Sequence, residues 1–336
     1  MTKRVGKATL RLGRCPSILG YAAYVGKKEK EGPLGRFFVH SSADTLFNCD
    51  TWETAESELQ RRTFSLAKAS AGLENENIDI MFGGDLLNQC IASAFASRGS
   101  ALPFVGLYGA CSTMAESLGL AALFVDGGYA STAAAITSSH FCSAERQYRF
   151  PLEYGGQRAP SAQWTVTGSG CAIVGCETVS KPQVAHVCFG SVVDLGVSDI
   201  NNMGSAMAPA AAETACRFFE DTATKPADYG AVVSGDLGEV GSALFVKLCR
   251  MAGYDVPNHL DCGKMIFNPK TQRVGAGGSG CGCSASVLSA YFLPMLERRE
   301  LDNILFIATG ALMSPTSYQQ GESIPSIAHL VHIKAK

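Results

Sequence analysis

Cys111 is the residue of this 336-residue sequence that is best placed to act as a nucleophile. It directly follows Gly109 and Ala110 and directly precedes a run of good helix formers. A cysteine in the first turn of a helix faces unpaired backbone N–H groups and the positive end of the helix dipole, and both favour the thiolate. The same N–H groups can hold a carbonyl oxygen or a carboxylate. A small buried side chain at a tight turn explains the position equally well, so both hypotheses stay open.

The second half of the chain repeats the surroundings of Cys111. Residues 229–253 share the layout of residues 78–99, a strand followed by Gly-Asp-Leu and a helix, so that Asp236 corresponds to Asp85. Residues 274–300 then give a Gly-rich turn into a helix, as at Cys111, and residues 303–312 give the next strand. This shared order indicates an internal duplication of about half the chain, which suits two α/β halves packed as one body.

The elements that position these residues are predicted from periodicity and from helix-end signals. We expect helices over 51–72 and 86–99, strands over 78–85 and 129–140, and a strand, tight turn and helix over 102–128. A polar loop over 141–164 leads into a predicted strand pair, 165–175 and 184–194. The predicted architecture is α/β, with halves 1–181 and 182–336 and five layers in the order helix, sheet, helix, sheet, helix.

Composition excludes several classes of protein. Apolar residues make up 46% of the chain and charged residues 17%, as in a globular protein, and a net charge of −2 gives no basic face for nucleic acid. We find no signal peptide, and the apolar runs end before they reach membrane-spanning length, so we expect a soluble chain. The 13 cysteines include no CxxC pair and no histidine at metal spacing, which favours reduced thiols without a metal site or cofactor.

Several motifs together resemble the thiolase and ketoacyl-synthase superfamily over nearly the whole chain. They are "GACSTMAESLGLAAL" at 109–123, "NNMGSAMAPAAAETA" at 201–215 and "GGSGCGCSAS" at 277–286. With "GDLGEVGSALF" at 235–245, the last two resemble one branch more closely, the stage V sporulation protein AD family of spore-forming bacteria. The resemblance implies a thiolase-like fold with Cys111 at the position that is acylated in the condensing enzymes.

The departures from the enzyme pattern imply a protein without catalytic activity. Condensing enzymes need a base or a pair of hydrogen-bond donors, usually His with His or His with Asn, beside the cysteine. This chain has Cys281 at one of those positions and the Gly-Asp-Leu step at 235–237 at the other. The last strand, "IATGALMSP", lacks the second cysteine of thiolases. None of the six histidines lies in a motif position; His140 comes nearest, and a core or exposed histidine is the alternative for it.

The resemblance to the sporulation family implies a ligand, pyridine-2,6-dicarboxylate (dipicolinate), which is taken up into the developing spore. We expect its site between the helix starts of the two halves, where backbone N–H groups favour anions. The predicted site residues are Cys111, Ser112, His140, Asp236, Glu239, Gly280, Cys281 and Gly282.

Charged residues near this site favour different hypotheses. Arg146, Arg149 and Arg158 are candidate carboxylate partners or simply solvated loop charges. Asp236 and Glu239 would repel a dicarboxylate unless they are protonated, bonded through water or bridged by Ca²⁺. Alternatively, Asp236, like Asp85, caps the helix that follows it.

Three classes of function therefore stay open: a dipicolinate-binding protein, an active acyl-thioester condensing enzyme that uses Cys111, and a structural subunit with an empty pocket. For the binding protein, the resemblance implies a membrane transport complex whose other subunits hold this chain at the spore inner membrane. We also expect a homodimer, in which strand 129–140 pairs with its copy across a two-fold axis.

Overall fold

The two halves of the chain form sheets with the same strand order. The computed structural model describes residues 3–148, 158–176 and 181–336. The first sheet has the order β3 (Ser17–Val25), β9 (Gly168–Gly175), β7 (Thr132–Ser139), β5 (Ile80–Gly84) and β6 (Phe104–Gly106). The second has the order β10 (Gln183–Phe189), β15 (Ser326–Lys334), β14 (Asn303–Ala311), β11 (Ala231–Ser234) and β12 (His259–Asp261). Within each half the strands thus follow one order, first, fifth, fourth, second and third along the chain, which confirms the predicted duplication. The boundary at 181/182 stays a prediction.

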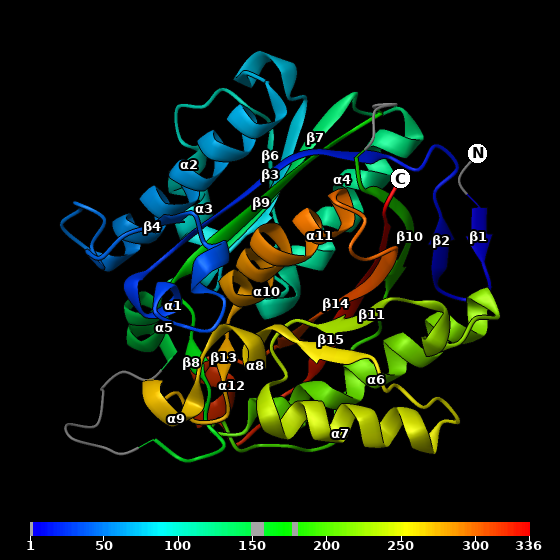
Figure 1. Ribbon diagram of the computed structural model, residues 1–336. Coiled ribbons are helices and arrows are strands. Elements are labelled where there is room, and N and C mark those ends of the chain that lie inside the picture. Colours follow the sequence, from blue (N-terminus) through cyan, green and yellow to red (C-terminus); the bar gives the residue numbers. More distant parts are fainter. Residues whose placement is uncertain (1–2, 149–157, 177–180) are drawn as a thin grey trace.

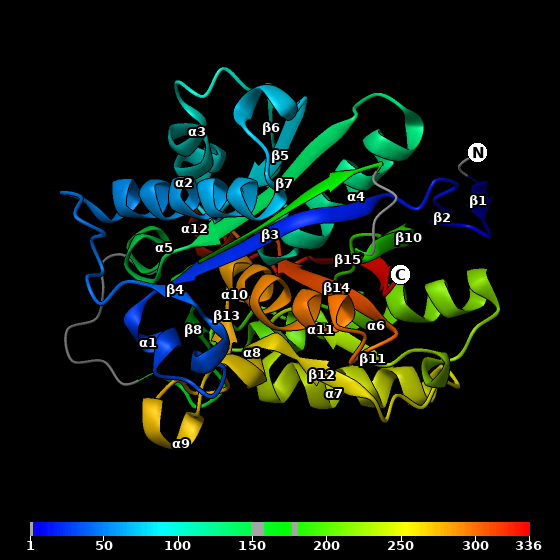
Figure 2. The same ribbon diagram turned by 45° about the horizontal axis from the view of Figure 1, so that its top comes forward.

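Helices cover both sheets and also separate them, as Figure 2 shows from top to bottom. The helices α2 (Trp52–Ala71) and α3 (Ile91–Ser97) cover the first sheet, and α6 (Met203–Thr222) and α7 (Gly238–Met251) cover the second. Between the sheets lie α4 (Thr113–Gly127), α10 (Cys281–Val287) and α11 (Leu293–Glu297), which can be followed in Figure 1. The five predicted layers are therefore confirmed.

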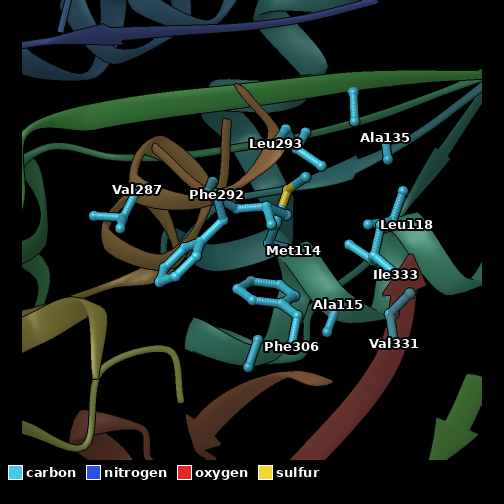
Figure 3. Close-up of a cluster of buried hydrophobic side chains, with 14 of the residues drawn as sticks. Met114, Ala115, Leu118, Ala135, Val287, Phe292, Leu293, Phe306, Val331 and Ile333 are labelled. Atoms are coloured by element: carbon cyan, nitrogen blue, oxygen red, sulfur yellow. The ribbon is translucent and has the colours of Figure 1, made fainter. Parts of the chain in front are cut away.

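The middle layer is apolar on all sides because both of its faces are covered by a sheet. Met114, Ala115 and Leu118 of α4 meet Phe306 of β14 and the apolar side chains of β15 and α11 (Figure 3). All of these side chains are fully or almost fully buried. This core holds α4 and α10, and with them the turns that begin each helix, in fixed positions.

Shorter elements complete the fold. They are β1 (Lys3–Val5), β2 (Thr9–Arg11), β4 (His40–Ser41), β8 (Trp164–Thr165), β13 (Gly278–Ser279), α1 (Lys27–Lys30), α5 (Phe141–Tyr148), α8 (Cys262–Ile266), α9 (Pro269–Gln272) and α12 (Pro315–Gln319). Within the described ranges, no helix combines the length and the apolar character that crossing a membrane requires.

Helix signals in the sequence located α2 closely and α3 less closely. Thr51 caps the start of α2 and Gly72 ends it with φ of 67°, as the predicted span 51–72 requires. The helix predicted over 86–99 begins only at Ile91. The reason is that Gln89 and Cys90 both have positive φ, 59° and 53°, which interrupts a regular helix.

Two predictions about strands are wrong. The segments 165–175 and 184–194 both contain a strand. The two sheets join where β3 pairs with β10 at Ser17 and Gln183, so β3 lies between β9 and β10 and those two strands do not pair. Strand β7, predicted to pair with its copy in a dimer, is hydrogen-bonded to β5 on one side and to β9 on the other. Its run of small, fully buried residues is typical of a central strand, and β6 lies at the edge of this sheet instead.

Candidate ligand pocket

Cys111 lies in a tight turn that joins β6 to α4. A short 3₁₀ turn, Ala110–Ser112, precedes the first residue of α4, so Cys111 stands one turn earlier than the sequence predicts. The Ser112 hydroxyl donates to the Gly109 carbonyl at 2.6 Å and so helps to fix the turn. Strand β14 passes so close that a Cβ atom at Gly310 would lie 2.3 Å from the Gly109 carbonyl oxygen, which explains glycine at that position.

Asp236 at the end of β11 lies directly beside Cys111. Its carboxyl group is fully buried and accepts hydrogen bonds from the Gly280 backbone N–H at 2.9 Å, the Thr309 hydroxyl at 2.8 Å and the Ser279 hydroxyl at 3.1 Å. The Cys111 thiol is a further donor. Burial nevertheless raises the pKa of Asp236 above its usual range, because these donors only partly replace water.

The N-terminus of α10 is therefore already occupied by protein acceptors. Gly280 donates to Asp236, and Gly282 donates its backbone N–H to the Ser139 hydroxyl at 3.1 Å. We expected these N–H groups to receive an anionic ligand, but the carboxyl group of Asp236 takes the place that an anion would have. Gly280 and Gly282 thus shape the turn and make no open donor site.

Cys111 is held as a thiol. Burial raises its pKa well above the ordinary value for cysteine, and the neighbouring Asp236 and Cys281 raise it further. Cys281 is also fully buried, and its thiol donates to the Ser138 carbonyl at 2.8 Å. The expectation that the helix start would favour a thiolate is wrong for this turn, because burial and an acidic neighbour outweigh the dipole.

A pocket opens at Cys111 toward the surface. It contains about 670 Å³ of empty space, its open mouth included. Its walls combine apolar side chains with amides and hydroxyls from several distant segments. They are Leu86, Ala110, Cys111, Ala144, Glu145, Tyr148, Gln163, Thr165, Ile200, Asn201, Met203, Ser279, Ala311 and Met313.

Charges at this pocket are largely paired. Arg158 contacts the Glu145 carboxylate at 2.7 Å and donates to the Gln163 carbonyl at 3.0 Å. Its guanidinium lies over the rings of Trp164 and Phe141, at 5.0 and 5.2 Å from their centres, which fixes its position. Within the described part of the chain, no cluster of three or more His, Cys, Asp or Glu residues could hold a metal ion.

The structure separates most of the predicted site residues from the pocket wall. Among those that it describes, Cys111 alone lines the pocket. His140 donates from Nε2 to the Thr45 carbonyl at 2.8 Å and packs against Phe47. Glu239 is half-exposed and pairs with Lys264 at 3.2 Å. Ser112, Cys281 and Gly282 lie behind the wall in the turns described above, while Asp236 and Gly280 lie beside it.

The predicted arginines also differ from one another. Arg146 pairs with Glu53 on α2 and does not line the pocket. Arg158 lies beside the pocket, because it contacts Glu145 and Gln163 of the pocket wall. Arg149 lies outside the described residues.

Asp85 and Asp236, which occupy equivalent places in the duplication, have different roles. Asp85 accepts from the Leu87 and Ser93 backbone N–H groups at 2.9 and 2.8 Å, so it caps the start of α3 as expected. Asp236 does not cap α7, because Asp261 accepts from the first N–H groups of that helix. Asp236 is instead free to face Cys111.

Similar solved structures define the class of fold. The chain aligns with 3-oxoacyl-[acyl-carrier-protein] synthase III from Aquifex aeolicus VF5 at 12% identity and a TM-score of 0.55, over 95% of this chain and 99% of that one. It aligns with a point variant of OleA from Xanthomonas campestris at 12% identity and a TM-score of 0.62, over 99% and 100%. With its duplicated sheets around a central layer of helices, the chain is thus a protein of the thiolase-like fold.

Sequence comparison places the chain more narrowly. The family model for stage V sporulation protein AD matches residues 6–334. Stage V sporulation protein AD of Bacillus subtilis (strain 168) is 43% identical over 305 residues, which are 90% of this chain and 90% of that protein. The chain belongs to the stage V sporulation protein AD family.

Proposed function

We propose that this protein binds dipicolinate in the pocket at Cys111 without transforming it, and serves the uptake of that ligand into the developing spore. Membership of a sporulation family and the pocket at Cys111 support the proposal. In this role it is a peripheral subunit of a membrane transport complex, held at the spore inner membrane by its partners.

The observation that carries the non-catalytic part is the set of groups around Cys111. Condensation needs a thiolate and a base or donor pair that stabilises an enolate. Here the cysteine faces a buried carboxyl group, Asp236, and a second thiol, Cys281, and burial raises the pKa of all three groups. Neither neighbour replaces an imidazole, because a buried acid accepts the thiol's hydrogen bond and a thiol is a weak donor.

The pocket has features that suit a flat aromatic dicarboxylate. Leu86, Met203 and Met313 offer apolar surface for a ring, and Asn201 and Thr165 offer polar groups at its edge. The raised pKa of Asp236 favours its neutral form, which removes one source of repulsion. Arg158, held over two rings beside Glu145, can share its guanidinium with a ligand carboxylate.

Titration calorimetry with dipicolinate and with benzoate tests the proposal. We expect saturable binding of dipicolinate and much weaker binding of benzoate, which has the ring but only one carboxylate. If neither ligand binds, the protein is a structural subunit with an empty pocket, and the proposal is wrong. If incubation with an acyl-CoA instead adds an acyl mass to Cys111, the competing function, an acyl-thioester condensing enzyme, is favoured.

A homodimer is part of the proposal, with β6 in place of β7 as the contact. Strand β6 lies at the edge of the first sheet, and edge strands offer unpaired backbone groups. Phe95, Val105 and Tyr108, on or next to α3 and β6, are exposed apolar side chains, at 38%, 38% and 49%. An apolar, unpaired edge of this kind suits an isologous contact between two copies.

A further inference from the structure

Two cysteines meet where α6 and α7 pack on the outer face of the second sheet. The two helices approach closely at their first turns, where a Cβ atom at Gly241 would lie 2.7 Å from the Gly204 carbonyl oxygen. Further along, the thiols of Cys216 on α6 and Cys249 on α7 are hydrogen-bonded to each other. Both cysteines are free thiols within one apolar cluster.

The two thiols differ in their access to solvent. Cys216 is 8% exposed and lines a surface groove between the helices, together with polar residues of α6, Leu248 of α7 and Ala252, which directly follows α7. Cys249 is fully buried behind it. Cys216 therefore lies nearer to solvent than Cys249.

We propose that Cys216 and Cys249 form an oxidation site, at which a hydroperoxide converts the two thiols into a disulfide that joins α6 to α7. In the first step the Cys216 sulfur attacks the peroxide, the O–O bond breaks, and a sulfenic acid and one water form. In the second step the Cys249 sulfur attacks the sulfenic sulfur, the S–O bond breaks, and a second water leaves. Overall, two thiols and one hydrogen peroxide give one disulfide and two waters.

The hydrogen bond between the thiols assigns the order of these steps. The Cys249 thiol donates to the Cys216 sulfur, which lowers the pKa of Cys216 and raises that of Cys249. A thiol with a lowered pKa and access to solvent reacts with peroxides first. Cys216 is thus the attacking residue and Cys249 the residue that completes the disulfide.

Another neighbouring cysteine pair provides an internal control. Burial and then the neighbouring Cys262 raise the pKa of the Cys283 thiol, so these two cysteines lie near each other, but both are fully buried. Cys176 is exposed and provides a positive control for oxidation of a single thiol. The proposal predicts a disulfide at the Cys216 pair, none at the Cys262 pair, and a sulfenic acid at Cys176.

The test treats the reduced full-length protein with hydrogen peroxide, adds dimedone to trap sulfenic acids, and maps the peptides by mass spectrometry without reduction. We expect a Cys216–Cys249 linked peptide in the parent protein that dithiothreitol releases. The melting temperature of the oxidised protein should rise by roughly 4 °C, since a cross-link restricts the unfolded chain.

Two variants separate the roles of the two residues. In Cys249→Ser, Cys216 should accumulate the dimedone adduct, because the second thiol is missing. In Cys216→Ser, Cys249 should remain a thiol, because it is buried. If Cys176 is oxidised in the parent protein while Cys216 and Cys249 stay reduced, the proposal is wrong. Adduct formation at Cys216 in the parent protein without any linked peptide would also contradict it.

Discussion

Removal of the Asp236 carboxyl group should destabilise the centre of the molecule measurably. In Asp236→Ala the Gly280 N–H loses its acceptor and cannot turn to another, while the hydroxyls of Thr309 and Ser279 must find new partners. One buried unpaired donor costs about 1–3 kcal/mol, and the small cavity adds to this, so we expect a loss of about 3 kcal/mol. With an unfolding entropy of about 0.7 kcal/mol/K for a chain of 336 residues, the melting temperature should fall by roughly 4 °C.

The matched control is Asp236→Asn. Its amide oxygen can accept from Gly280, and Thr309 can rotate to accept from the amide N–H₂, so we expect a loss of at most about 1 kcal/mol at neutral pH. Because burial raises the pKa of Asp236, its contribution to stability is largest in acid and falls as the pH rises. The difference in stability between the parent protein and Asp236→Asn should therefore shrink as the pH rises above the usual pKa of an aspartate, about 4. Calorimetry that finds Asp236→Ala as stable as Asp236→Asn would refute this account of the turn.

Three other predictions follow from charges and edges. Burial raises the pKa of Glu56 to about 8, so its contribution to stability is present below about pH 4.5 and is lost as the pH rises to about 8. In urea unfolding, the free energy of unfolding of Glu56→Gln should therefore increase relative to that of the parent protein over that range. Arg158→Gln should weaken dipicolinate binding about tenfold, whereas Arg146→Gln, which breaks a similar ion pair away from the pocket, should leave the affinity unchanged. If both variants change the affinity equally, Arg158 is not part of the site. Val105→Lys should give a monomer mass by light scattering, while the same change at exposed Met251 should not; a dimer that survives Val105→Lys places the contact elsewhere.

Local signals and internal repetition were enough to predict the architecture. The equivalence of the Gly-Asp-Leu steps at Asp85 and Asp236 fixed which strands and helices correspond, and α2 carries ordinary end signals at Thr51 and Gly72. Strand neighbours were harder, because pairing depends on segments far apart in sequence. The position of β3 between β9 and β10 has no local signal, and the missed strand led to the wrong pair.

The meeting of the turns at Cys111 was predicted from the sequence, whereas the residues that line the pocket were not. Motif positions brought Cys111, Asp236 and Cys281 together correctly, since equivalent turns of duplicated halves meet in the middle. The pocket walls come instead from α5, from the segment before β8 and from the start of α6, where Tyr148 and Asn201 have no recognisable pattern. The hydrogen bond from the Gly280 N–H to Asp236 has no sequence signal, because it is a 2.9 Å contact between residues that lie 44 positions apart.

Dipicolinate titration of two Cys111 variants tests the central claim most directly. Cys111→Ser keeps the size of the side chain and should bind with nearly the parent affinity, because the proposed role involves no covalent step. Cys111→Trp fills the pocket and should abolish binding while circular dichroism shows an unchanged fold. Binding that survives Cys111→Trp would place the ligand elsewhere, and binding lost in Cys111→Ser would show that thiol chemistry is required, which contradicts a protein that only binds.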